Sequence, residues 1–165
     1  AFSNNFFRLY KAESIEAMQI GGAVKNIISI ASGISSGLGY GDNTIAALIT
    51  RGIQEIIRFS KIYTSDNKTL LGVSGIGDLI ATATSKHSRN KCLGYSIGKG
   101  KTLDQALNDM QMVVEGVATT KAVYLMSKKH SISMPICSEV YNILFQGKDP
   151  AVAINELMSR KLKSE

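Results

Sequence analysis

The sequence predicts an all-α protein, and three observations support this fold class. Beyond residue 12, apolar residues recur at helical spacing, and no stretch alternates apolar and polar residues as a half-buried strand does. Proline occurs only twice in 165 residues, which favours helices over a loop-rich β-sandwich. Hydrophobic residues make up 44% of the chain and charged residues 19%, so a single domain of ordinary size can bury a core.

The first helix is expected to lie at the centre of this domain. It begins after Ser14 and continues to about residue 34, and its apolar residues cover nearly every face, as in a buried helix. Gly21 and Gly22 lie within it, and each costs about 1 kcal/mol relative to alanine. Such a cost suggests that another backbone or a ligand approaches there. Residues 1–12 show no helical pattern and fit a connector or the last strand of a preceding domain.

Further helices with short connections are expected, to give eight or so in all. A glycine-rich loop ends at Gly41, and Asp42 or Asn43 is expected to cap a second long helix, whose core stripe runs from Ala46 to Phe59. The later helices are expected at 67–73, at 78–83, at 90–98, from the capping box Thr102–Gln105, at 117–129, from Pro135 to Gly147, and at 150–158 after the cap Asp149.

The basic charge of the chain indicates an anionic partner without identifying it. The net charge of +6 fits nucleic acid, an acidic membrane or a phosphorylated small molecule, and an ordinary basic surface explains it equally well. No apolar run approaches the ~18 residues of a membrane span, and there is no signal-peptide pattern. The chain begins without methionine, which suggests a piece of a longer protein.

The cysteines and histidines show no metal-binding pattern. Cys92 and Cys137 are far apart and form neither a CxxC motif nor a zinc spacing, so we expect two buried free thiols in a reducing cytoplasm. His87 and His130 have no acidic or cysteine neighbour at ligand spacing and are expected at the surface. No metal site is predicted.

The glycine clusters do not match a nucleotide-binding motif. The segment 37–41 is GxGxG between two helices, whereas a dinucleotide fingerprint is GxGxxG between a strand and a helix. The segment 75–77 lacks the third glycine, and the segment 94–99 is too short for a P-loop. Most of these glycines therefore fit helix ends and close helix packing.

Three polar features could carry chemistry. Lys25 lies among small and aliphatic residues, where an amine is suited to proton transfer, although a lysine that snorkels to the surface fits the pattern equally well. Asp78 follows a glycine turn, where an ordinary helix cap is the simpler interpretation. The segment 84–90 places hydroxyl, amide and cationic side chains before a helix, as in a phosphate site or a polar loop.

Several segments follow one another in an order that is specific as a set, although each alone is weak. They are Phe7-Arg8-Leu9-Tyr10, Gly21-Gly22-Ala23-Val24-Lys25-Asn26, Gly39-Tyr40-Gly41-Asp42-Asn43, Ala46-Ala47-Leu48-Ile49-Thr50-Arg51-Gly52, Gly75-Ile76-Gly77-Asp78-Leu79, Thr84-Ser85 with Ser88-Arg89-Asn90, and Val113-Val114-Glu115-Gly116. This ordered set resembles the bacterial-type NAD(P)-dependent glycerol-3-phosphate dehydrogenases, from about residue 6 to the end of the chain.

The resemblance implies a domain arrangement and a reaction. Residues 13–165 would form a helical substrate domain similar to the C-terminal domain of 6-phosphogluconate-type dehydrogenases, and residues 1–12 would connect it to an N-terminal Rossmann domain that this chain lacks. The full enzyme would reduce dihydroxyacetone phosphate to sn-glycerol 3-phosphate with NAD(P)H, for phospholipid precursor synthesis in the cytoplasm. The chain alone would be inactive, and a homodimer is possible.

The resemblance also implies roles for individual residues. Lys25 corresponds to the family's catalytic base. The substrate contacts correspond to Lys25, Asp78, Ser88, Arg89 and Asn90. The cofactor contacts within this half correspond to Arg89, Val113 and Glu115, with the main cradle for NAD(P)H in the N-terminal domain.

Two other functions remain open on the sequence. A related dehydrogenase acting on another hydroxy acid would share the fold and the lysine, although the run 88–90 favours a phosphorylated substrate. A basic helical module that binds nucleic acid would carry its cations along one exposed helix, whereas the cations here are spread. The preference for NADH or NADPH would depend on residues of the absent domain. The sequence does not decide whether Arg89 contacts the substrate phosphate or the cofactor.

Overall fold

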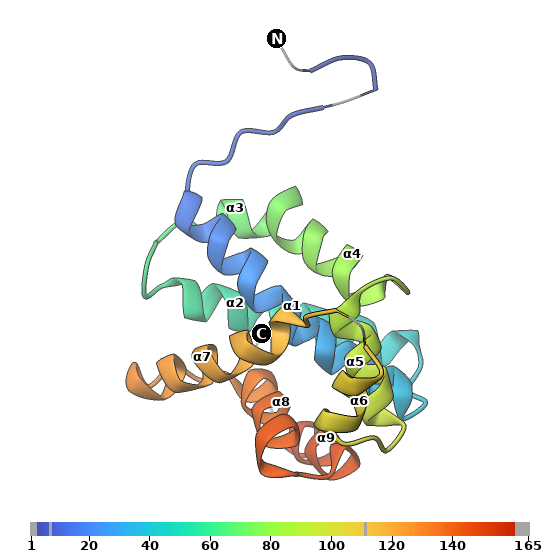
Figure 1. Cartoon of the computed structure of the whole chain (residues 1–165). Coiled ribbons are helices and arrows are strands. Elements are labelled where there is room, and N and C mark those ends of the chain that lie inside the picture. The colour runs from blue at the N-terminus through green and yellow to red at the C-terminus, as the bar shows by residue number, and fades with distance from the viewer. Residues whose placement is uncertain (1–2, 7, 111, 161–165) are drawn as a thin grey trace.

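The computed structural model describes residues 3–6, 8–110 and 112–160. Within these residues the chain forms nine α-helices and one short π-helix, without a strand, which confirms the all-α prediction (Figure 1). The elements are α1 (Ile15–Gly37), α2 (Asp42–Ser60), α3 (Lys68–Leu71), η1 (Val73–Gly77), α4 (Asp78–Thr84), α5 (Arg89–Gly98), α6 (Leu103–Asn108), α7 (Glu115–Lys129), α8 (Pro135–Gln146) and α9 (Pro150–Met158).

Helix α1 is the centre of the fold, as its apolar pattern predicts. It packs against α2, α3, α4, α5, α7 and α8. The hydroxyl of Ser14 accepts a hydrogen bond from the amide of Ala17 at 3.1 Å and so caps its start. Every residue in the range 26–35 is buried, but Ile15 is 71% exposed and Met18 faces outward. The first turns differ from the prediction because they lie at the edge of the helical body, where the N-terminal segment leaves it (Figure 1).

Helices α1 and α5 touch through their backbones. The contact, here called the glycine seam, consists of Gly33 and Gly37 on α1 and Gly94 and Gly98 on α5. A Cβ atom at Gly33 would lie 2.1 Å from the carbonyl oxygen of Lys91, and one at Gly94 would lie 2.0 Å from that of Ile30. Both separations are far inside van der Waals contact, so a side chain at either position would force the helices apart. The close-packing interpretation of these glycines is confirmed.

A buried carboxylate joins α2 to α8. Glu55 is 1% exposed, and its two oxygens accept hydrogen bonds from the amides of Ile136 at 2.6 Å and Cys137 at 3.1 Å. Pro135 occupies the first position of α8 and has no N–H, so these amides are the first that need an acceptor. Burial raises the pKa of Glu55, and the two backbone hydrogen bonds oppose this shift. No local pattern in the sequence points to this contact.

The ends of the C-terminal helices follow the predicted signals. Helix α8 begins at Pro135 and ends at Gly147, whose φ of 66° is the left-handed conformation that favours glycine. The carboxylate of Asp149 accepts hydrogen bonds from two amides in the first turn of α9. Lys148 pairs with Glu139 of α8 at 2.5 Å and with Glu156 of α9 at 2.8 Å, and these hydrogen bonds raise the pKa of the Lys148 ammonium. The predicted capping box at residues 102–105 is also present.

The start of α2 differs from the prediction. Gly41 is the capping residue, and no side chain caps the helix. Asp42 instead lies in the first turn, where a negative charge favours the helix dipole. The buried stripe is offset as well, because Ile45 and Ile49 face the core whereas Ala46 is exposed.

Two smaller expectations also need correction. Cys92 is exposed and only Cys137 is buried, because Cys92 lies on the outer side of α5, away from the glycine seam; both thiols are free. Helix α7 begins at Glu115, two residues earlier than predicted. The two additional residues can join the helix because the amide of Gly116 finds an acceptor outside it, in the side chain of Asn90.

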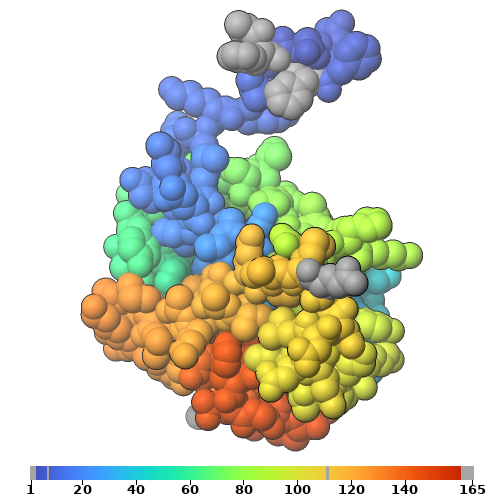
Figure 2. Space-filling model, in the orientation of Figure 1, coloured from blue at the N-terminus to red at the C-terminus, as the bar shows by residue number. Residues whose placement is uncertain are grey.

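The N-terminal segment extends away from the helical body (Figure 2). The described residues 3–6 and 8–12 form no strand, and Phe6 is fully exposed at 100%. Residue 7 of the first motif lies outside the described residues. The interpretation of this segment as a connector to another domain stays a prediction.

The glycine seam predicts that Gly33→Ala destabilises the protein by about 3 kcal/mol, because the added methyl group meets the backbone of α5. The measurement is urea unfolding followed by circular dichroism. Gly22→Ala is the matched control on the same helix, since nothing lies within 4 Å of the added methyl. This control should be neutral or stabilising by up to about 1 kcal/mol. Equal stability of the two variants would contradict the close backbone contact between α1 and α5 at the glycine seam.

Because Glu55 is the acceptor for two buried amides at the start of α8, we expect Glu55→Ala to lower the free energy of unfolding by about 2–4 kcal/mol. Glu55→Gln, which keeps one acceptor oxygen, should cost less in the same urea titration.

The pH dependence of the Gln variant completes this test. Since the pKa of Glu55 is raised above its ordinary 4.5, the folded state binds the proton more tightly than the unfolded chain. The stability of the unsubstituted protein should therefore fall, relative to Glu55→Gln, as the pH rises from 4.5 through the raised pKa. A difference in stability between the two proteins that does not change with pH would argue against a raised pKa of Glu55 in the folded state.

Candidate active site

Lys25 and Asp78 form an ion pair between the middle of α1 and the first residue of α4. The Lys25 ammonium donates to Oδ2 of Asp78, and the two side chains are 19% and 40% exposed. Oδ1 of Asp78 lies 3.4 Å from the hydroxyl of Thr82, one turn later on α4. Gly77 holds the cap position of α4 without a side-chain hydrogen bond, so the interpretation of Asp78 as an ordinary cap is wrong. Lys25 is a half-buried, paired amine.

A folded-back segment carries Asp78 to Lys25. Around η1 the chain turns tightly, and a Cβ at Gly75 would lie 2.0 Å from the carbonyl oxygen of Leu70. Gly21, one turn before Lys25, packs against this segment, and a Cβ there would lie 3.1 Å from the Leu70 side chain. The near neighbour of Gly21 is thus a side chain and not the expected backbone, which comes no closer than 4.0 Å, at Gly75, and Gly22 faces open space. Because Gly21 and Lys25 share a face of α1, the same packing places α4 beside the lysine.

The start of α5 presents three consecutive polar residues. The hydroxyl of Ser88 caps the helix by accepting from the amide of Lys91 at 3.3 Å. Arg89 is exposed, whereas Asn90 is buried and its Oδ1 accepts from the amide of Gly116 at 3.0 Å. A Cβ at Gly116 would lie 2.3 Å from that oxygen, so this position also requires glycine. Asn90 thus joins the start of α5 to the start of α7.

The three residues expected to contact the cofactor lie together. The Arg89 guanidinium donates through Nη1 to the carbonyl oxygen of Val113 at 3.0 Å, and its Nη2 lies 3.9 Å from the Glu115 carboxylate. The side chains of Arg89 and Glu115 are 42% and 67% exposed. A planar guanidinium at this accessible position can bind a phosphate or carboxylate through two parallel hydrogen bonds.

A buried serine connects the two halves of the site. The hydroxyl of Ser29 donates to the carbonyl oxygen of Thr82 at 3.0 Å and lies 3.0 Å from the hydroxyl of Ser88. Neither Ser29 nor Thr82 stands out in the sequence. Each, however, follows a candidate residue by one helical turn, Ser29 after Lys25 and Thr82 after Asp78, and that spacing places them on the same helix faces.

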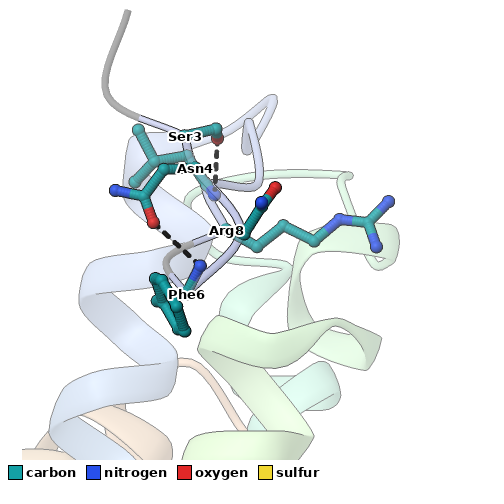
Figure 3. Close-up of a pocket in the computed structure, with 6 residues that line it drawn as sticks. Ser3, Asn4, Phe6 and Arg8 are labelled. Atoms are coloured by element: carbon teal, nitrogen blue, oxygen red, sulfur yellow. Dashed lines mark hydrogen bonds between the residues drawn. The ribbon is translucent and has the colours of Figure 1, made fainter.

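Two concavities can be compared as binding sites. One of about 560 Å³ lies along residues 3–6, 8 and 9, where the side chains of Asn4 and Ser3 accept hydrogen bonds from backbone amides of the same segment (Figure 3). It is formed by a single extended segment and does not involve the residues of the ion pair. The other, of about 500 Å³, is bordered by Asp78 with Met18, Val73 and Ala81. The second concavity is the one adjacent to the chemistry, because it contains the partner of Lys25.

The described part of the chain can also be compared with the requirements of a metal site and of a membrane span. No group of three or more histidine, cysteine or acidic side chains is placed to hold a metal ion in residues 3–6, 8–110 and 112–160. Among the described helices, none has both the length and the apolar character needed to cross a membrane.

Comparison with known proteins decides the family. The model for the family "NAD-dependent glycerol-3-phosphate dehydrogenase C-terminus" matches residues 14–155. The chain belongs to this family. The resemblance drawn from the ordered motifs is thus confirmed.

Similar proteins include glycerol-3-phosphate dehydrogenases (NAD(P)+) of two bacteria. That of Thermoanaerobacter sp. (strain X514) is 52% identical over 165 residues, which are 100% of this chain and 50% of the relative. That of Staphylococcus saprophyticus is 50% identical over 164 residues, covering 99% of this chain and 49% of the relative. The crystal structure of glycerol-3-phosphate dehydrogenase from Coxiella burnetii superposes with a TM-score of 0.91 at 39% identity, covering 96% of this chain and 49% of that one. The chain spans about half the length of these relatives.

Proposed function

We propose that the protein containing this chain reduces dihydroxyacetone phosphate to sn-glycerol 3-phosphate with NAD(P)H, in the cytoplasm and for phospholipid precursor synthesis. The observation that carries the proposal is the ion pair of Lys25 and Asp78 beside a concavity, in a member of the dehydrogenase family. The named relatives, all of them glycerol-3-phosphate dehydrogenases, support the choice of substrate.

The start of α5 would bind the substrate phosphate. Arg89 offers a guanidinium, and the free amides at a helix start favour an oxyanion. Asn90 adds an amide group held in place by Gly116. Ser88 lies at the cap position of the same turn. This arrangement favours a phosphorylated substrate over another hydroxy acid.

Lys25 would exchange the proton. In the reducing direction its ammonium donates a proton to the C2 oxygen as that carbon is reduced, and in the oxidising direction the amine accepts the proton from the C2 hydroxyl. Asp78 holds the ammonium at one position through Oδ2. Since Lys25 is only 19% exposed, few water molecules compete for its proton.

The residues of this chain fit the edge of a dinucleotide site and not its centre. Arg89, Glu115 and the exposed Val113 would contact the cofactor, which supplies the hydride when bound. The described glycine turns lie between helices, so the pyrophosphate cradle would belong to an N-terminal Rossmann domain joined through residues 1–12. The half-exposed apolar side chains of Met18 and Val73, beside Asp78, would be covered by that domain.

Lys25→Ala in the protein expressed with its cofactor domain should lower kcat by about 10²–10⁴-fold and change KM for dihydroxyacetone phosphate much less, because the proton donor is lost. Steady-state kinetics measure both constants. Lys148→Ala is the matched control, since the Lys148 side chain is 20% exposed, close to the 19% of Lys25, and is also ion-paired, but links α8 to α9. Near-normal turnover of Lys25→Ala would contradict the assignment.

The phosphate assignment predicts that glycerol 3-phosphate binds far more tightly than glycerol, because Arg89 and the α5 amides lose their partner in the unphosphorylated molecule. Isothermal titration calorimetry with the cofactor-loaded protein measures both affinities. Similar affinities would instead favour a dehydrogenase of an unphosphorylated hydroxy acid.

A further inference from the structure

Ser29 lies where the helices that carry the candidate site meet. It is completely buried on α1, one turn after Lys25. Building on the proposed function, we propose that Ser29 is a positioning residue, whose hydroxyl holds the start of α5, with Arg89 and Asn90, at a fixed place relative to Lys25.

The hydrogen bonds of Ser29 have one consistent direction. A serine hydroxyl carries a single proton, and that of Ser29 goes to the carbonyl oxygen of Thr82, which cannot donate. The 3.0 Å contact between Ser29 and Ser88 must then be donated by Ser88. Ser88 in turn accepts from the amide of Lys91. One directed series of hydrogen bonds therefore runs from the first turn of α5, through α1, to the last turn of α4.

Each end of this hydrogen-bond series lies next to a residue of the proposed mechanism. Ser88 directly precedes Arg89, and Thr82 is one turn from Asp78 on α4. A shift of α5 along α1 would break the bond between Ser29 and Ser88, and a shift of α4 would break the bond to Thr82. Within the contact between α1 and α5 that the glycine seam fixes, the Ser29 hydroxyl thus links the phosphate end of the site directly to the proton-transfer end.

The arrangement also defines the part played by Ser88. While its proton is donated to Ser29, the Ser88 hydroxyl has none to donate to a phosphate oxygen. Phosphate recognition then depends on Arg89, Asn90 and the backbone amides, and Ser88 acts by placing them.

A neighbouring serine provides a matched control. Ser32 is also completely buried on α1, and its hydroxyl donates to the carbonyl oxygen of Ala83, also in the last turn of α4, at 2.8 Å. This hydrogen bond joins α1 to α4 and does not involve α5. Ser29→Ala and Ser32→Ala therefore remove the same kind of bond to α4, but only Ser29→Ala also removes a bond to the phosphate end.

The experiment compares these variants in the protein expressed with its cofactor domain. Ser29→Ala should raise KM for dihydroxyacetone phosphate about tenfold and change kcat less than about threefold, because the phosphate end is displaced while Lys25 and Asp78 remain paired. Ser32→Ala should change both constants less than about twofold, although thermal unfolding shows a similar loss of stability in the two variants. If Ser29→Ala does not fold, Ser29→Cys, which keeps the size of the side chain with a weaker donor, is measured with the same expected rise in KM.

A double substitution tests the route of the effect. If Ser29 acts through Ser88, then Ser29→Ala added to Ser88→Ala should change KM less than about twofold further. Equal kinetics for Ser29→Ala and Ser32→Ala, a loss confined to kcat, or additive effects on KM would each overturn the inference. No turnover by the unsubstituted protein would contradict the proposed function as well, whereas normal turnover with an inert Ser29 substitution would overturn only this inference.

Discussion

The glycine seam between α1 and α5 is the contact on which the rest of the structure depends. Because Gly33, Gly37, Gly94 and Gly98 have no side chains, carbonyl oxygens of one helix lie where a Cβ of the other would be. Two helix backbones in such contact have little freedom to slide or separate. The start of α5 is thereby held beside α1, close enough for Ser88 to reach Ser29, while Asn90 reaches across to Gly116 at the start of α7.

Side chains, most of them buried, satisfy the backbone groups at the helix ends around α1, and several of these side chains belong to the candidate site. The last-turn carbonyls of α4 accept from Ser29, Ser32 and the ammonium of Lys91. The first amides of α8 and the Gly116 amide of α7 donate to Glu55 and Asn90. Unsatisfied backbone groups at buried helix ends are costly, so the side chains that satisfy them are tightly placed. The polar residues of the candidate site therefore lie within a rigid framework.

The division of labour proposed for the enzyme follows from what this half contains. A paired lysine and an accessible arginine at a helix start suit proton transfer and phosphate binding. The described residues contain no strand followed by a glycine turn, so the chain would meet the dinucleotide only through the residues near Arg89. Substrate choice would thus belong to this chain and cofactor choice to the domain that completes it. Under this proposal, part of the positive charge of the chain would act locally, at Lys25 and Arg89.

Local signals in the amino-acid sequence were sufficient to predict the helices, several of their ends and, through the order of the motifs, the family. Pro135, Gly147 and Asp149 act on their own neighbours, so their effect can be predicted without a fold. Which helices meet could not be predicted in this way. Lys25 and Asp78 are 53 positions apart, Glu55 and Ile136 81, and Ser29 and Ser88 59. Spacing along the chain does not specify these contacts, because they arise only when the glycine seam and the turn at η1 bring distant helices together.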